Sequence, residues 1–216
     1  MIKNIILDVD GTIWDSTGVV AKAWVKAAQQ LGLPTKDITP SRLKKEFGKT
    51  MQVIFYNIFG EQKDASLYQE MEKKLYVYEH DFLMECEEDL TYPFMKETIE
   101  ELAKQYGIYI VSNCQKGYIE LVCEKTGIKN FVKDYTCYGE TLLPKSGSMT
   151  KLIERNQLCK EECVYVGDIL GDEESAHSAG ISFAHAAWGF GESMNPEYVV
   201  KNFSELKNAF KKEICE

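Results

Sequence analysis

The fold of this chain is decided near its start by the stretch Ile5-Ile6-Leu7-Asp8-Val9-Asp10-Gly11-Thr12. Its first three residues are apolar, as in a buried strand of a parallel sheet, where helices cover both faces and strict alternation is lost. Side chains two residues apart in an extended segment point the same way, so Asp8 and Asp10 can face one small volume. Gly11 then allows a sharp turn that leaves room for a ligand.

Two carboxylates placed this close repel each other unless a cation or a shared proton offsets their charge. The pair is therefore costly as a purely structural feature. A turn that carries two solvated acids is the alternative interpretation. Which of the two interpretations holds depends on whether the rest of the chain supplies further residues for a ligand site.

The composition is that of a globular protein with a proper core. The chain has 216 residues, of which 44% are hydrophobic and 27% charged, and we expect one domain with a smaller insertion. Lys and Arg total 25 against 34 Asp and Glu, a net charge of −9, which disfavours nucleic acid or an anionic membrane as a partner. The chain shows no secretion signal and no apolar run long enough to cross a membrane. We expect a cytoplasmic protein, and no protein partner is predicted.

The seven cysteines are scattered, and their spacing does not match the paired pattern of zinc sites. We expect free thiols, because nothing in the sequence indicates an oxidising compartment. Two of them lie four residues apart and could meet on a helix, but neither has a paired partner elsewhere. The cysteines are Cys86, Cys114, Cys123, Cys137, Cys159, Cys163 and Cys215, and the close pair is Cys159 and Cys163.

Two patterns of secondary structure divide the chain. Residues 16–88 contain helical stripes only, such as Val20, Trp24 and Ala27, and the longest helix is expected to begin at Asp64. From Pro93 onward, helices alternate with short β-rich runs. This alternation predicts an α/β fold, a Rossmann-like doubly wound parallel sheet, formed by residues 1–15 and 89–216. Residues 16–88 are predicted to form an inserted all-helical domain.

Further polar residues follow two other predicted strands. Ser112 and Asn113 follow one apolar run, and Gly167 and Asp168 follow another. Ligands of open α/β sheets bind beyond the carboxyl ends of the strands, so these residues can converge on the first motif. With Asp172, the number of carboxylates rises to four. Such a group requires a hard cation, and oxygen ligands favour magnesium over zinc.

Each of these later residues also has an ordinary structural interpretation. Asp172 could cap a helix, and Asp168 could serve in a turn. Lys145 could be a solvated charge before a helix. A set of acids that binds a phosphoryl dianion nevertheless needs a fixed positive partner, which lysine can supply. Ser112 and Asn113 can donate hydrogen bonds to the same phosphoryl oxygens.

The order and spacing of these motifs resemble the haloacid dehalogenase (HAD) superfamily of phosphotransferases. The resemblance covers nearly the full chain, since the helical block lies where that family carries a small helical cap domain. The turn Trp188-Gly189-Phe190-Gly191 resembles the phosphoglycolate phosphatase-like branch, although a plain Gly-rich turn explains it equally well. Ile169 departs from the pattern, because many relatives have a small hydroxyl residue there.

The resemblance implies specific roles for these residues. Asp8 would be the nucleophile that forms an aspartyl-phosphate, and Asp10 the general acid and then the general base. Magnesium would be held by Asp8, Asp168 and the backbone carbonyl of Asp10. Asp172 would assist the metal site or fix the lysine. The phosphoryl group would be bound by Ser112, Asn113 and Lys145.

The leading hypothesis is a magnesium-dependent phosphatase that hydrolyses a small phosphorylated metabolite. The alternatives are a sugar phosphomutase of the β-phosphoglucomutase type and a phosphoacceptor or metal-binding module that regulates a partner without turnover. A dehalogenase is disfavoured by Asp10, the second acid typical of phosphoryl transfer in the family. Arg42 and Lys49 are candidates for recognising the substrate; the alternative is that they lie on a solvated helix face.

Overall fold

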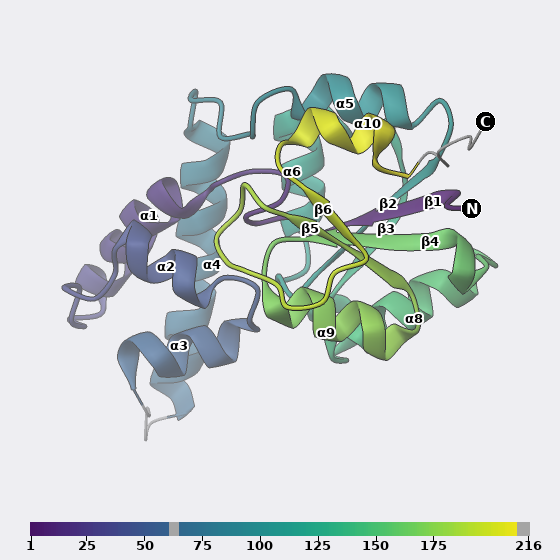
Figure 1. The fold of residues 1–216 in the computed structure, drawn as a ribbon. Helices are drawn as coiled ribbons and strands as arrows, with labels where there is room; N and C mark the ends of the chain where they lie inside the picture. Colours follow the sequence, from purple (N-terminus) through teal and green to yellow (C-terminus); the bar gives the residue numbers. More distant parts are fainter. Residues whose placement is uncertain (61–64, 211–216) are drawn as a thin grey trace. The chain divides into compact units, whose positions relative to one another are not determined.

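The computed structural model describes residues 1–60 and 65–210 (Figure 1). The chain forms two compact units. Unit 1 comprises Met1–Trp14 and Thr91–Glu216, and unit 2 comprises Asp15–Leu90. None of the helices in the described part is long and apolar enough to cross a membrane.

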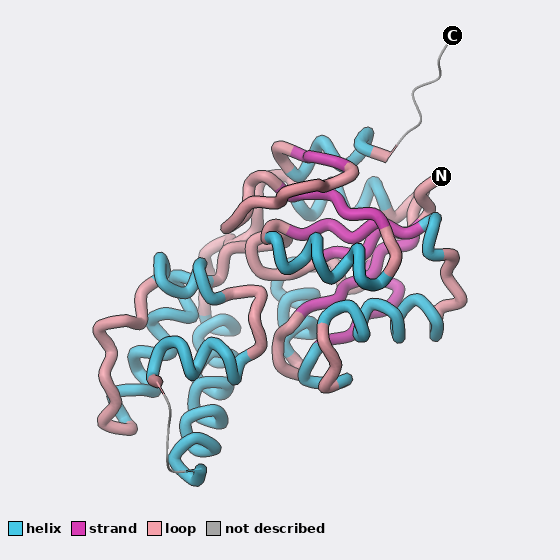
Figure 2. The backbone as a smooth tube through the Cα atoms, turned by 60° about the horizontal axis from the view of Figure 1, so that its bottom comes forward, coloured by secondary structure: helices cyan, strands magenta, loops and turns pink. Residues whose placement is uncertain are grey.

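Unit 1 is built on a six-stranded sheet, whose strands are magenta in Figure 2. Every neighbouring pair of strands is parallel. The predicted Rossmann-like doubly wound fold is confirmed. The strand order is β3-β2-β1-β4-β5-β6. The strands are β1 (Asn4–Leu7), β2 (Gly107–Ser112), β3 (Val132–Cys137), β4 (Cys163–Gly167), β5 (Ser182–Ala186) and β6 (Tyr198–Val200).

Helices cover both faces of this sheet. Figure 1 shows α5 and α10 on one face and α8 and α9 on the opposite face. The helices of unit 1 are α5 (Met95–Leu102), α6 (Tyr118–Thr126), α7 (Tyr138–Thr141), α8 (Lys145–Arg155), α9 (Leu170–Ala179) and α10 (Leu206–Ala209), with short 3-10 helices η1 (Lys160–Glu162) and η2 (Phe203–Glu205).

The central strands are apolar because both of their faces are covered. Every residue of β2 and β4 is buried, and Ile5 and Ile6 of β1 have no exposed surface. Ile6, Tyr165 and Phe183 pack in one cluster with Leu152 of α8 and Ala176 of α9. Burial of each large apolar side chain contributes about 1.5–3 kcal/mol, so this cluster holds the sheet and its helices together.

The topology reverses at β1. This strand pairs with β2 on one side and with β4 on the other, while the chain continues outward in both directions. The carboxyl ends of β1 and β4 are adjacent, since Leu7 pairs with Val166 and the Asp8 amide donates to the Val166 carbonyl at 2.9 Å. A reversal of this kind opens a crevice in which open α/β sheets bind ligands.

The outer strands are less evident from the sequence. In β3, which begins at Val132, only the last two residues are buried. β6 was not expected, because it has only three residues and Val199 is exposed. Its extended backbone is fixed by pairing with β5, a contact between segments that residue patterns do not record.

Unit 2 is helical, and its described residues include no strand of a sheet. The stripe of Val20, Trp24 and Ala27 is buried. The start expected for the longest helix, Asp64, lies outside the described residues. The helices are α1 (Thr17–Gln30), α2 (Pro40–Glu46), α3 (Met51–Phe59) and α4 (Ala65–Glu85).

The cysteines of the described part are free thiols. Cys163 donates to the Cys159 carbonyl at 3.2 Å, and the two residues flank η1 rather than facing each other on a helix. Cys215 lies outside the described residues.

A buried polar contact joins α1 to α4 within unit 2. The Trp24 indole N–H donates to Glu79 Oε2 at 2.8 Å, and only 3% of Glu79 is exposed. The Trp24 ring also packs against Phe55, with 5.7 Å between ring centroids. This contact fixes the register of the two longest helices of the unit.

We predict that Glu79→Ala lowers the free energy of unfolding by about 1–3 kcal/mol, because the buried Trp24 N–H loses its acceptor. Urea unfolding followed by tryptophan fluorescence measures the change. Glu79→Gln keeps an acceptor oxygen, so its free energy of unfolding should fall clearly less. Equal losses in both variants would contradict this account of the contact.

Candidate active site

The first motif forms a tight turn directly after β1. The Ile13 amide donates to the Val9 carbonyl at 2.7 Å, and the Gly11 amide donates to the Trp14 carbonyl at 2.9 Å. Gly11 has φ +84°, and a Cβ atom there would lie 2.1 Å from Asp168 Oδ2. Only glycine permits this conformation and this approach, so the turn can pack directly against the end of β4.

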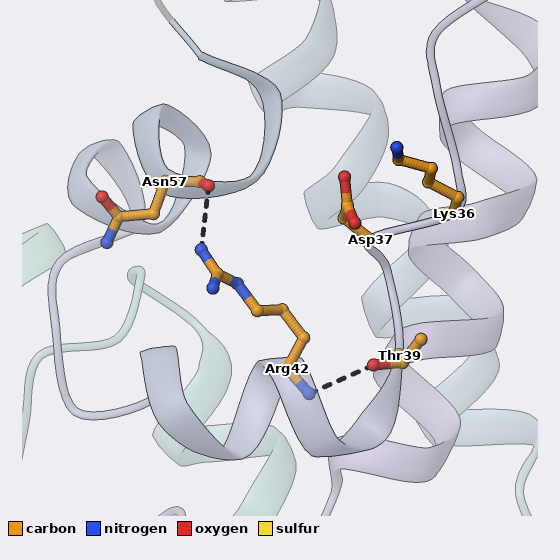
Figure 3. A pocket seen from close by; sticks show the side chains of 5 residues that line it. All are labelled: Lys36, Asp37, Thr39, Arg42 and Asn57. Atoms are coloured by element: carbon orange, nitrogen blue, oxygen red, sulfur yellow. Dashed lines mark hydrogen bonds between the residues drawn. The ribbon is translucent and has the colours of Figure 1, made fainter.

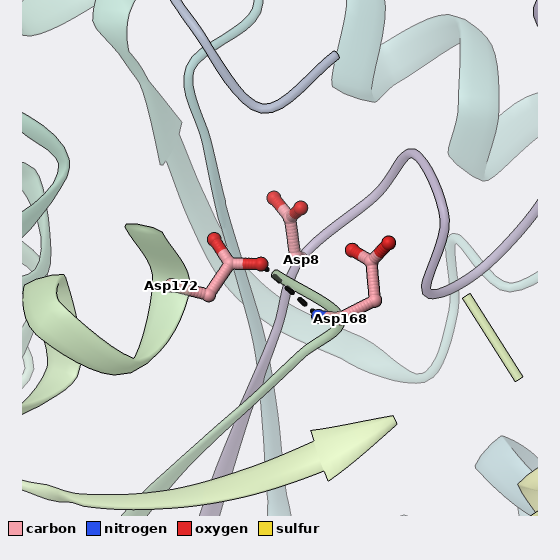
Figure 4. A group of neighbouring side chains, drawn as sticks. All are labelled: Asp8, Asp168 and Asp172. Carbon is pink, nitrogen blue, oxygen red and sulfur yellow. Dashed lines mark hydrogen bonds between the residues drawn. The ribbon is translucent and has the colours of Figure 1, made fainter. Parts of the chain in front are cut away.

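Three carboxylates from distant segments converge beside this turn. Asp8 follows β1, Asp168 follows β4, and Asp172 lies in the first turn of α9; all three are buried. One ligand oxygen from each lies within 4.8 Å of the others. Figure 4 shows the carboxylates of Asp8 and Asp168 pointing in the same direction, with Asp172 beside them. A cluster of this kind requires positive charge.

Lys145 supplies one positive charge from the first turn of α8. Its Nζ atom lies 3.1 Å from Asp8 Oδ1 and 2.6 Å from Asp172 Oδ1, and only 4% of the residue is exposed. The alternative interpretation of Lys145 as a solvated charge is therefore wrong. The lysine bridges two of the three carboxylates inside the protein.

Asp172 combines the two interpretations that the sequence leaves open. Its Oδ1 atom accepts from Lys145, while its Oδ2 atom accepts from the backbone amides of Asp168 and Ile169 at 3.1 and 3.3 Å. The carboxylate thus caps the N-terminus of α9 and orients the lysine at the same time.

The charges in this cluster remain unbalanced. Burial raises the pKa of Asp8 to about 7, although Lys145 acts to lower it. Burial and then the Asp172 and Asp8 carboxylates raise the pKa of Asp168 to about 8. Burial lowers the pKa of Lys145, but Asp172 and Asp8 raise it more, so the ammonium stays charged. One ammonium does not offset three carboxylates, and the cluster therefore favours a second cation.

The turn after β5 holds Asp168 in place. The Phe190 amide donates to Asp168 Oδ2 at 2.7 Å, and Thr12 Oγ1 lies 3.5 Å from Asp168 Oδ1. A Cβ atom at Gly189 would lie 2.2 Å from Asp168 Cβ and 2.5 Å from the Gly11 carbonyl oxygen. The Trp188-Gly189-Phe190-Gly191 turn therefore packs against the site and needs glycine to do so.

The Asp10 side chain has different surroundings. Its Oδ1 atom accepts from Tyr118 Oη at 2.8 Å and from Trp14 Nε1 at 3.1 Å. Among the described residues, the group of converging carboxylates consists of Asp8, Asp168 and Asp172 and does not include Asp10. Of the four carboxylates that the sequence predicts to converge, the Asp10 side chain is therefore the one outside this group in the described part of the chain.

Ser112 and Asn113 lie at the same edge of the sheet. Leu7 pairs with Ile110, so β2 ends with Ser112 beside the segment that begins at Asp8. Ser112 is buried, with 6% of its surface exposed. Both residues can donate hydrogen bonds to an anion bound at this edge.

Sequence reasoning missed several residues of the site. Tyr118 lies 108 positions from Asp10, and no motif contains it. Phe190 acts through its backbone amide, which every residue except proline possesses. Trp14 was the one residue of this group that its position could have indicated, because it lies only four residues after Asp10.

Comparison with known proteins agrees with this geometry. A family model for haloacid dehalogenase-like hydrolases matches residues 5–186. The chain is 28% identical over 218 residues to a phosphoglycolate phosphatase of Vibrio parahaemolyticus, covering 95% of this chain and 94% of that protein. It is 25% identical over 220 residues to a phosphoglycolate phosphatase of Aquifex aeolicus, covering 99% of each.

A solved structure shares the fold. The crystal structure of a predicted phosphoglycolate phosphatase from Haemophilus somnus superposes with a TM-score of 0.81 at 21% identity, covering 95% of this chain and 96% of that chain. The parallel sheet and the family match over most of the chain define a hydrolase with a Rossmann-like core. The chain belongs to the haloacid dehalogenase-like hydrolases. The predicted enzyme class, a phosphatase of this superfamily, is confirmed.

We predict that Lys145→Met lowers kcat/KM for p-nitrophenyl phosphate at least about 100-fold, because the buried carboxylates lose their fixed cation. Initial-rate kinetics measure the effect, with thermal unfolding to confirm that the variant is folded. Lys151→Met, which removes an exposed ammonium from the same helix, is the matched control and should keep wild-type kinetics. A folded Lys145→Met enzyme with wild-type activity would contradict the role of the lysine.

Proposed function

We propose that the protein is a magnesium-dependent phosphomonoesterase that forms an aspartyl-phosphate on Asp8. The observation that carries the proposal is the buried cluster of Asp8, Asp168 and Asp172 bridged by the ammonium of Lys145. Such a site can receive a phosphoryl dianion only if further positive charge enters with it.

The donor set fits a magnesium ion. The converging ligand atoms are carboxylate oxygens, and hard divalent cations prefer oxygen ligands. Asp8, Asp168 and the backbone carbonyl of Asp10 would hold the ion, with Asp172 assisting while it fixes Lys145. When bound, the ion would offset the negative charge on the phosphoryl oxygens.

The remaining chemistry belongs to side chains of unit 1. A carboxylate oxygen of Asp8 attacks phosphorus in line, and the bond to the leaving oxygen breaks. Asp10 gives its proton to the departing alkoxide. Lys145, Ser112 and Asn113 hold the phosphoryl oxygens during the transfer.

The second half of the cycle restores the enzyme. Asp10, now a carboxylate, accepts a proton from a water molecule, whose oxygen attacks phosphorus and breaks the bond to Asp8. Phosphate leaves, Asp8 is again a carboxylate, and Asp10 again carries a proton.

The leaving group is proposed from the relatives. Two proteins that match nearly the full chain are named phosphoglycolate phosphatases, and a small phosphorylated metabolite such as phosphoglycolate is therefore the proposed substrate. In this proposal residues 1–15 and 89–216 form the catalytic core domain, and residues 16–88 form the cap domain that selects the leaving group.

Unit 2 contains a polar pocket of about 330 Å³ (Figure 3), lined by Lys36, Asp37, Thr39, Arg42 and Asn57. Arg42 donates to the Asn57 carbonyl at 3.0 Å and pairs with Glu46 at 3.1 Å. Lys49 pairs with the same glutamate at 2.7 Å. These contacts support a structural role for Arg42 and Lys49 within unit 2 rather than a role in substrate recognition.

We predict that magnesium-dependent phosphate release from 2-phosphoglycolate exceeds release from sugar phosphates, nucleotides and pyrophosphate. Asp8→Asn should abolish release from every substrate, because an amide cannot attack phosphorus. Phosphate release at steady state measures both effects, and Asp81→Asn, at an exposed position in α4, should be unchanged.

Two other outcomes would overturn the proposal. Stable phosphorylation of Asp8 without phosphate release would favour the regulatory module. Conversion of a sugar phosphate to its isomer would favour the phosphomutase.

We also predict that magnesium stabilises the protein more at pH 8.5 than at pH 6. The folded-state pKa values of Asp8 and Asp168, about 7 and 8, lie above the usual carboxyl value. The metal-free fold therefore keeps these protons at pH 6 and loses stability as pH rises toward 8. Magnesium has to displace the protons, so its binding tightens through this range.

Thermal unfolding with and without magnesium at each pH measures the difference in the shift of Tm. Asp168→Asn should reduce the shift at both pH values, since a ligand oxygen and its charge are lost. A shift in the wild-type protein that is equal at pH 6 and pH 8.5 would refute the linkage.

A further inference from the structure

The Asp10 carboxylate accepts two hydrogen bonds at one of its oxygens. Tyr118 Oη and Trp14 Nε1 both donate to Oδ1, at 2.8 and 3.1 Å. The two donors come from different segments of unit 1, the turn after β1 and the start of α6. Two hydrogen bonds from different directions fix both the position and the rotation of a carboxyl group.

Both donors are themselves rigid. Trp14 is 1% exposed and Tyr118 is 5% exposed, and their rings meet edge to face with 6.0 Å between centroids. The Trp14 carbonyl accepts from the Gly11 amide, which ties the indole to the turn that carries Asp10. Well-packed aromatic donors lose little further freedom when they orient a neighbour.

The chemistry of the donors suits a group that exchanges a proton. An indole N–H and a phenol O–H donate to an aspartate whether it is protonated or ionised. Tyr118 and Trp14 can therefore hold Asp10 in both of its protonation states.

We propose that Tyr118 and Trp14 are positioning residues for general acid–base catalysis, holding the Asp10 carboxyl group in place while it gives its proton to the leaving oxygen and later accepts one from water. This inference rests on the proposed function of Asp10. It adds two residues that act through Asp10 and do not touch the substrate.

Two substrates with different leaving groups distinguish a positioning role of Tyr118 and Trp14 from a role in packing alone. An alkyl phosphate releases a strongly basic alkoxide and needs the proton of Asp10, whereas p-nitrophenyl phosphate releases a weakly basic phenolate and does not. The ratio kcat/KM reports the steps up to phosphorylation of Asp8, where this difference is expressed. A general loss of folding or of Asp8 reactivity would lower kcat/KM for both substrates together.

The experiment measures kcat/KM of Tyr118→Phe with 2-phosphoglycolate and with p-nitrophenyl phosphate. Loss of one hydrogen bond should lower the value about 10-fold for 2-phosphoglycolate and less than about 2-fold for p-nitrophenyl phosphate. Trp14→Phe should show the same selectivity, and the double variant should approach the selective loss seen in Asp10→Asn. If another alkyl phosphate in the substrate panel is turned over faster, that compound replaces 2-phosphoglycolate.

Tyr106→Phe is the matched control. It removes a phenol hydroxyl from the residue just before β2, at the opposite end of that strand from Ser112, and should leave both kcat/KM values unchanged. An equal loss for both substrates in Tyr118→Phe, or no loss, would overturn the positioning role while Asp10→Asn still shows selective loss. Wild-type activity of Asp10→Asn toward 2-phosphoglycolate would instead overturn the proposed function of Asp10 itself.

Discussion

The site depends on one buried ammonium group. Lys145 lies between Asp8 and Asp172, and a carboxylate oxygen of Asp168 lies within 4.8 Å of an oxygen of each of them. Removal of these charges from water costs several kcal/mol for each ion, and attraction to the lysine offsets only part of that cost. Backbone amides contribute further, from Phe190 to Asp168 and from the start of α9 to Asp172. The residual negative charge explains why the site suits a divalent cation and, with that cation, a phosphoryl group.

The topology of the sheet brings these groups together. Asp8 and Asp168 follow adjacent parallel strands at the point where the strand order reverses, so both emerge at one edge of the sheet. Glycine then sets how closely the loops approach. A side chain at Gly11 or Gly189 would overlap Asp168, which means that the carboxylate occupies the space that these residues leave vacant. The composition of two loops thus controls the geometry of a residue that belongs to neither.

The two aspartates of the first motif have different environments although only one residue separates them. Asp8 is paired with an ammonium and surrounded by carboxylates, whereas Asp10 accepts from a phenol and an indole. The ammonium suits a group that attacks phosphorus or holds a metal, because it favours the ionised form of the carboxyl group. Neutral donors suit a group that exchanges a proton, because they can donate to it in both protonation states. The division of labour proposed for the two residues follows from this difference.

The sequence by itself determined the doubly wound sheet, because apolar runs and helical stripes are local patterns. The strand ends identified Asp8, Ser112 and Asp168 as candidates, and the need for a fixed positive partner identified Lys145. Only the tertiary structure showed that Lys145 is buried between two of the carboxylates, that Phe190 donates through its backbone, and that Tyr118 contacts Asp10 across 108 positions of sequence. β6 belongs with these, since a three-residue edge strand exists only through its neighbour. The physical reason is common to all of them. Periodicity and spacing record what a segment buries, whereas a contact between distant segments depends on packing, and a backbone amide has no signature in the sequence.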